Sequence, residues 1–142
     1  MRKVSHILDS KGRRVISVPQ EAPVLEVIRL MAEHHIGAVL VMRGPELIGI
    51  ATERDYARKV ILQGRSSAET PVSTIMSSPV VCVSPEDSIT ACMELVTERR
   101  IRHLPVREGD AVVGLISIGD LVRMVIEEQQ QEIQQLQQYI AS

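Results

Sequence analysis

Short apolar runs and an amphipathic segment alternate in the first half of the chain, and each has the periodicity of one kind of element. Apolar residues recur at helical spacing from Val24 to His34, with Gly37 as the expected stop. Two apolar runs flank Arg43-Gly-Pro-Glu46, a pattern typical of a hairpin with a glycine turn. The pattern therefore predicts strand 15–18 (ended by Pro19), helix 24–34, strands 38–42 and 47–51, and helix 53–61 capped by Thr52.

The second half repeats this pattern at a fixed distance. Residues 15–61 align without a gap on residues 80–126, a shift of 65, and 13 of the 47 aligned positions are identical. Unrelated segments of ordinary composition would share roughly three. A period of this length indicates one supersecondary unit used twice, with the order β-α-β-β-α in each copy. The repeat predicts strand 80–83, helix 88–99, strands 103–107 and 111–117, and a helix from Ile118.

The segments that lead into the two copies also match. Val4-Ser-His-Ile-Leu8 mirrors Val72-Ser-Thr-Ile-Met76 at a shift of 68, so the first copy carries three extra residues near Leu8–Gly12. The predicted fold class is α/β, and continuous apolar strands need cover on both faces. Helices should cover one face of each sheet and the sister copy the other. We assign motif 1 to 1–63, a polar linker to 64–71, motif 2 to 72–126 and a helical extension to 127–142, with the motifs forming one compact module.

The C-terminal extension has a heptad pattern in a segment otherwise rich in Gln and Glu. Steps of four and three connect one set of positions: Val122, Ile126, Gln129, Ile133, Leu136 and Ile140. This is a short coiled-coil seam with one polar position, and it can add to an existing dimer contact. The alternative is an amphipathic helix that folds back on its own domain.

Composition narrows the classes of function. Hydrophobic residues make up 44% of the chain but aromatic residues only 1%, and the net charge is −2. A chain with few aromatic residues and no basic face is a poor match for nucleic-acid binding. No apolar run approaches a membrane span, and the N-terminus lacks a signal-peptide core, so we expect a cytoplasmic protein without membrane contact. Cys82 and Cys92 are interpreted as small apolar residues, and no His/Cys/Asp cluster predicts a metal site.

The candidate chemistry centres on Gly-x-x-Ser/Thr-x-x-Asp, which occurs once in each copy at the end of a strand and the start of a helix. The residues are Thr52 and Asp55 in the first copy and Ser117 and Asp120 in the second. A hydroxyl and a carboxylate three residues apart commonly form a capping box. The same pair at a helix N-terminus can hold the two hydroxyls of a ribose. Because the pattern recurs in register in a repeated unit, we favour a ligand role.

A second candidate element distinguishes the two copies. Arg102 and His103 stand at the entry to the central strand of the second copy, where the first copy has the neutral Gly37 and Ala38. These two cationic groups could bind a phosphate, unless they are simply solvated charges at the start of a strand. Lys11 belongs to a basic turn before the first strand and could reach a phosphate in the first cleft. The two sites should therefore differ in ligand or affinity.

Together these features resemble a tandem cystathionine-β-synthase (CBS) domain pair, also called a Bateman module. The resemblance rests on the repeated unit, the paired Ser/Thr-x-x-Asp motifs, Val72–Pro85 and Arg102-His-Leu-Pro-Val106. It implies two motifs packed sheet to sheet about a pseudo-twofold axis, with two clefts for adenosine ligands such as AMP, ADP, ATP, NAD or S-adenosylmethionine. It further implies that the aspartates hold ribose, that Val15 and Val80 line the adenine slots, and that Arg102 and His103 meet phosphate.

The run Glu53-Arg-Asp-Tyr56 is similar to that of small stand-alone signalling members, and on that resemblance Arg54 joins the candidate binding residues. The leading interpretation is a non-enzymatic nucleotide sensor that acts through a homodimer or a protein effector. The alternative is a structural or dimerisation scaffold whose clefts are vestigial. An enzyme is not expected, because no nucleophile constellation or glycine-rich phosphate loop is present.

Overall fold

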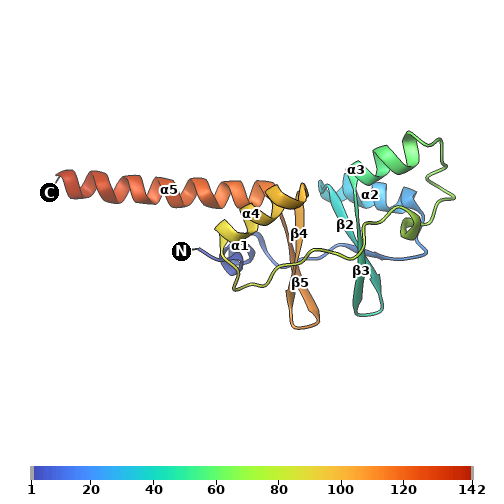
Figure 1. Cartoon of the computed structure of the whole chain (residues 1–142), viewed down its shortest axis with the longest axis horizontal. Coiled ribbons are helices and arrows are strands. Elements are labelled where there is room, and N and C mark those ends of the chain that lie inside the picture. The colour runs from blue at the N-terminus through green and yellow to red at the C-terminus, as the bar shows by residue number, and fades with distance from the viewer. Residues whose placement is uncertain (1, 142) are drawn as a thin grey trace. The chain divides into compact units, whose positions relative to one another are not determined.

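The computed structural model describes residues 2–141, which fall into two compact units (Figure 1). The first unit combines the segment ending at Arg14 with Cys82–Gly109 and the segment from Val113 onward. The second unit combines Val15–Val81 with Asp110–Val112. The mixed α/β fold predicted from the sequence, with a C-terminal helix, is confirmed, whereas the packing of one copy on the other stays a prediction.

A three-stranded sheet forms the centre of the second unit. Its central strand β2 is buried from Ala38 to Val41, because it pairs on both sides, parallel with β1 and antiparallel with β3. Leu40 lies opposite Ser17 on one side and Ile50 on the other. The elements are β1 (Ser17–Pro19), α2 (Val24–His34), β2 (Ala38–Arg43), β3 (Glu46–Thr52), α3 (Glu53–Tyr56), the π-helical turn η1 (Ala57–Ile61) and the 3₁₀ turn η2 (Val72–Thr74).

The first unit contains a hairpin and three helices. Its elements are α1 (Val4–Lys11), α4 (Ile89–Arg99), β4 (His103–Glu108), β5 (Ala111–Ser117) and α5 (Ile118–Ala141). The predicted strand 80–83 is wrong, since only Val83 bridges to Val106. The reason lies in β4: Pro105 occupies the position of Leu40, whose N–H bonds to Ile16 O in the other unit. Proline has no N–H to donate, so this strand loses a ladder bond.

The lead-in segments are exchanged between the copies. Val4 N donates to Asp87 O at 2.9 Å in the first unit, and Val72 N donates to Ala22 O at 2.8 Å in the second. Each copy therefore docks its lead-in on the α-helix and strands of its sister. This is why α1 belongs to the unit of α4 and α5, and why the compact units do not follow the order of the sequence.

The helix boundaries follow the predicted pattern with two differences. Helix α2 ends at His35, which takes a left-handed conformation at φ 55°, so the stop lies before the expected Gly37. The corresponding Arg100 ends α4 in the same way at φ 54°. Predicted helix 53–61 begins as α3 but continues as the π-helical η1, in which Leu62 N bonds to Ala57 O.

Helix α5 runs without a break from Ile118 to Ala141, and its C-terminal half extends past α1 and α4 (Figure 1). The apolar seam positions are exposed, with exposed fractions that rise from 41% at Val122 to 81% at Ile140. The helix therefore does not fold its seam back on the described part of the chain.

Candidate functional site

Asp120 is the centre of a charged cluster in the first unit. It is buried, and its Oδ2 accepts hydrogen bonds from Ser117 N at 2.8 Å, Ser117 Oγ at 3.0 Å and Lys11 Nζ at 2.7 Å. Its Oδ1 accepts from Arg123 Nη2 at 2.6 Å. Asp120 N returns a bond to Ser117 Oγ at 3.3 Å, so the serine and the aspartate cap the start of α5 reciprocally.

Lys11 lies in a different place from the one predicted. We expected it in the cleft of the first copy, but its ammonium bridges Asp120 Oδ2 and Leu115 O in the second copy. The physical reason is the exchange of lead-ins, which packs α1 against α5. The three extra residues of the first lead-in extend α1 as far as Lys11, so the insertion supplies the cation.

The protonation states in this cluster depend on burial and on Lys11. Burial favours the neutral acid, but hydrogen bonds from Lys11 and Ser117 outweigh it, and the pKa of Asp120 lies below its usual 3.8. Burial, followed by the charges of Lys11 and Arg102, lowers the pKa of His103 from 6.5. His103 is therefore neutral at pH 7 and can offer a hydrogen bond but no charge. This differs from the predicted pair of cations.

A small open pocket lies beside Asp120, between α1 and α5. Its volume is about 220 Å³, and it is lined by Ile7, Ser10, Lys11, Asp120, Arg123, Met124 and Glu127. Cationic and anionic groups alternate around it, so polar ligands with both donors and acceptors suit its chemistry.

Asp55 has a related arrangement in the second unit. Its Oδ2 accepts from Thr52 N at 3.0 Å and Thr52 Oγ1 at 3.1 Å, and Asp55 N donates to Thr52 Oγ1 at 3.2 Å. Lys59 Nζ lies 3.1 Å from Asp55 Oδ1 and also donates to Ile75 O at 2.9 Å. The capping-box geometry expected as the alternative to a ribose site is thus present in both copies.

The two aspartate clusters differ in the origin of their cations. Asp55 takes its lysine from its own helical segment, one turn further along. Asp120 takes Lys11 from the exchanged lead-in and a second cation, Arg123, from α5. Movement of α1 would therefore change the charge around Asp120, whereas Lys59 stays on the same helical segment as Asp55.

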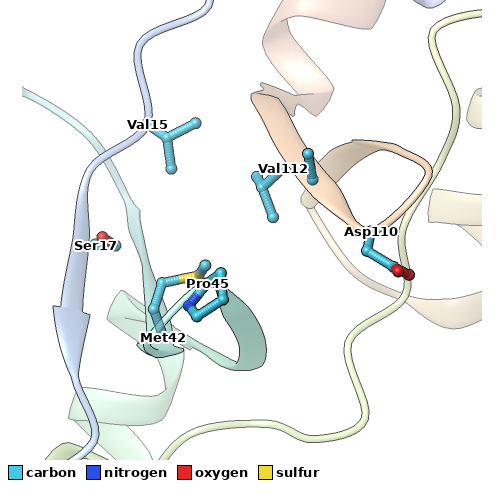
Figure 2. A pocket seen from close by; sticks show the side chains of 7 residues that line it. Val15, Ser17, Met42, Pro45, Asp110 and Val112 are labelled. Carbon is cyan, nitrogen blue, oxygen red and sulfur yellow. The ribbon is translucent and has the colours of Figure 1, made fainter.

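Val15 lines another pocket, and neither Asp55 nor Asp120 is among its lining residues. Figure 2 shows Val15 and Val112 on opposite sides of this open apolar pocket, with Met42 and Pro45 at its base. Its volume is about 390 Å³, and its lining residues, all of the second unit, are Val15, Ser17, Met42, Pro45, Asp110, Ala111 and Val112. Most of its lining residues are apolar, and the contact of Val15 with adenine stays a prediction.

Three predicted site residues remain: Val80, Arg54 and Arg102. Val80 is half-buried outside both pockets, and Arg54 is exposed on α3. The side chain of Arg102 is exposed, while its carbonyl accepts from Ile118 N at 2.8 Å and joins the start of β4 to the start of α5. The corresponding bond in the other copy joins Glu53 N to Gly37 O at 3.1 Å.

The sequence interpretation missed Lys59 and Arg123. Both follow an aspartate by one helical turn, a spacing at which opposite charges pair on a helix. Arg123 also had a signal in the repeat, because Arg58 occupies the corresponding position. In the first copy the pairing cation is Lys59, four residues after Asp55, so the repeat alignment alone does not identify it.

Metal binding and membrane spanning are both unsupported by the geometry of residues 2–141. Within that range, no group of three or more His, Cys, Asp or Glu side chains is placed to hold a metal ion. Over the same residues, every helix is too short or too polar to span a bilayer.

Comparison with known proteins identifies the family. A family model for the CBS domain matches residues 4–61 and again 72–127. The mitochondrial CBS domain-containing protein CBSX3 of Arabidopsis thaliana is 39% identical over 146 residues, 96% of this chain and 71% of that protein. A solved CBS-domain protein of Burkholderia ambifaria MC40-6, assigned provisionally to signal transduction, is 50% identical with a TM-score of 0.86, over 90% of this chain and 96% of that one.

A third match is more distant. A CBS domain protein from Pyrobaculum aerophilum, solved as a complex with AMP, is 25% identical, with a TM-score of 0.75 over 84% of this chain and 89% of that one. The doubled family match accounts for the repeat and for the two reciprocal capping motifs. The chain belongs to the CBS domain family and carries two copies of the domain in tandem.

Proposed function

We propose that the protein is a non-enzymatic sensor of adenosine nucleotides of the AMP, ADP, ATP or NAD class. Ligand binding would act through the geometry of a homodimer or through a protein effector. The observation that carries this proposal is the recurrence, in each copy, of a buried aspartate bonded to a hydroxyl and an amide at a helix start. The AMP complex of the Pyrobaculum aerophilum relative supports the ligand class.

The Asp120 cluster has the groups that a nucleotide requires. Among the contacts described for residues 2–141, Oδ1 of Asp120 accepts only from Arg123, so it has a lone pair for a ribose hydroxyl. Lys11 can exchange its bond with the carboxylate for one with a phosphate, because a lysine ammonium is a mobile point charge. His103 lies within the electrostatic reach of Lys11, Arg102 and Asp120 and adds a hydrogen-bonding group to this cluster.

The two sites would then prefer different ligands. The Asp120 site combines two cationic side chains on one carboxylate, Lys11 and Arg123, and suits phosphorylated ligands. At the Asp55 site Lys59 is the cation that contacts the carboxylate, and the neutral Gly37 stands where the second copy has Arg102. We expect AMP or a larger nucleotide at Asp120 and a weaker or less charged adenosine ligand at Asp55.

A thermal-shift panel with AMP, ADP, ATP, NAD, S-adenosylmethionine and GTP, followed by calorimetry, tests the proposal. A ligand at about 100 times its dissociation constant stabilises the folded state by about 2.7 kcal/mol. For a domain of this size that raises the melting temperature by roughly 2–8 °C. A selective shift with an adenosine ligand, absent in Asp120→Ala, supports the sensor. A flat panel at millimolar concentrations contradicts it.

The scaffold remains a second candidate, because each aspartate already takes part in a capping box and an ion pair. Such contacts stabilise helix starts without any ligand. On this hypothesis Asp120→Ala lowers stability but changes neither nucleotide response nor dimer geometry. The thermal-shift panel separates the two functions, since only the sensor predicts stabilisation that depends on the adenosine moiety.

A further inference from the structure

One face of α5 is apolar and exposed. We call its six positions the α5 seam: Val122, Ile126, Gln129, Ile133, Leu136 and Ile140. The exposed fractions of Ile126, Ile133 and Leu136 are 47%, 53% and 61%. Continuous apolar stripes of this kind on a solvent-exposed helix mark interaction sites.

The rotation of α5 about its axis is fixed by contacts on its other face. Met124 is buried, and Arg2 donates to Met124 Sδ at 3.0 Å, pairs with Glu127 Oε2 at 3.5 Å and donates to Gln131 Oε1. In a heptad with Ile126 at a, these three α5 residues take positions f, b and f. They lie opposite positions a and d, so the contacts of the helix with its own unit turn the seam outward.

We propose that the α5 seam pairs with the α5 seam of a second copy of this chain as a parallel, two-stranded coiled coil. Isoleucine occupies the a positions (Ile126, Ile133, Ile140), and Leu136 occupies a d position. β-branched residues at a with leucine at d favour two parallel strands over three or four. The sequence of the α5 seam therefore favours pairing with the same helix of a second copy.

Gln129 sets the register and the orientation. In the parallel arrangement it meets Gln129 of the partner subunit, and each side-chain amide supplies the donor that the other accepts. An antiparallel arrangement would bury Gln129 against an apolar residue and leave its amide unsatisfied. One buried polar layer of this kind fixes register in coiled coils at some cost in stability.

The charges beside the seam agree with this pairing. Glu132 at position g faces Gln137 of the partner subunit at position e, so no like charges meet across the interface. Glu127 and Glu128 lie at b and c, on the outside. The inference rests on the seam alone, so it stands or falls independently of nucleotide binding.

Sedimentation of the full chain over a series of concentrations tests the pairing. Ile133→Asp/Leu136→Asp introduces two charges into the seam, whereas Gln134→Asp/Gln135→Asp introduces the same charges at positions b and c. We expect the dissociation constant of the dimer to rise at least about tenfold in the seam variant and to change little in the control. A wild-type chain that stays monomeric, as it would if a different protein occupied the seam, overturns the proposal. Equal dimerisation of both variants overturns it as well.

A cross-linking experiment tests the parallel orientation. Gln129→Cys places two thiols in the same layer of a parallel pair, within the distance that a disulfide spans. Mild oxidation should convert this variant to covalent dimer, while Gln134→Cys should stay at the wild-type background set by Cys82 and Cys92. Equal cross-linking of both variants, or none above background in a sample that sedimentation shows to be dimeric, rules out the parallel register.

Discussion

Lys11 Nζ lies 2.7 Å from Asp120 Oδ2, although 109 positions separate the two residues in the chain. The contact joins the lead-in of the first copy to the helix start of the second. It makes the buried carboxylate dependent on a lysine whose side chain remains 42% exposed and therefore exchangeable. A ligand that competes for either group would loosen the hold of α1 on α5.

Replacement of Lys11 tests the phosphate assignment. Lys11→Met keeps most of the aliphatic stem and removes the charge, so AMP should bind about 10- to 100-fold more weakly, the usual worth of a charge-assisted hydrogen bond. Adenosine should bind as well as before, or better, because Lys11 no longer competes for Asp120. Calorimetry with both ligands measures the difference. Arg13→Met, which removes an exposed charge paired with Asp9, is the matched control. An equal loss for AMP and adenosine would remove the assignment.

Truncation of the capping hydroxyls tests their structural role. Ser117→Ala and Thr52→Ala should each lower the free energy of unfolding by about 0.5–2 kcal/mol, because each hydroxyl satisfies a helix-start amide. Urea denaturation measures the loss. Thr90→Ala, at an exposed site in α4, should change it little. Wild-type stability in both cap variants would show that the reciprocal bonds contribute nothing in solution.

The two aspartates should be removable without loss of the fold. Asp55→Ala and Asp120→Ala leave lysine and arginine side chains that are exposed enough to regain water. Each variant should keep its native circular dichroism while losing one class of nucleotide site, as calorimetry would measure. A variant that unfolds would assign the carboxylate to stability rather than to ligand binding.

The lowered pKa of His103 predicts a pH dependence of stability. The folded state holds this imidazole neutral, whereas the unfolded chain binds a proton near pH 6.5. The unfolded state therefore takes up protons first as the pH falls, so stability should decrease as the pH drops through about 6.5, until the imidazole of the folded state is protonated as well. In His103→Gln the slope should be shallower, as measured by urea midpoints across this range. An unchanged slope would show that His103 is not the titrating group.

Gly114 lies against the exchanged lead-in with no room for a side chain. A Cβ there would come within 2.6 Å of Leu8 Cδ2, so Gly114→Ala should cost roughly 1–3 kcal/mol of stability. In Gly114→Ala/Leu8→Ala the new methyl group occupies the space that Leu8 leaves, so the double variant should lose less than the sum of the single variants. Additive losses would mean that the two residues do not meet in solution. The equivalent Gly49 lies against Met76 of the other lead-in, so Gly49→Ala should destabilise the second unit in the same way.

Much of the fold follows from patterns within each copy. The helices 24–34 and 88–99 and the hairpin strands were predictable because their apolar spacing and caps are local signals. The missing strand at 80–83 depends on the N–H that Pro105 lacks across the sheet. Neither lead-in was predicted to be helical, and their exchange depends on tertiary packing that no local pattern encodes.

The candidate site was predictable in part for the same reason. The hydroxyl and aspartate of each capping motif are three residues apart, so their contact could be read from spacing. Lys11 was assigned to the first cleft, whereas its partner Asp120 lies in the other copy, and its role in ligand binding stays a prediction. The neutral state of His103 could not be predicted from the sequence either, since it depends on the burial of the imidazole and on the nearby charge of Lys11.

The exchange of lead-ins has a consequence for biosynthesis. Val4, Ile7 and Leu8 are buried only in the unit that α4, β4, β5 and α5 complete, and those elements are translated long after α1. During synthesis, the apolar face of α1 therefore lacks its packing partners while Val15–Val81 are translated and fold around a different lead-in.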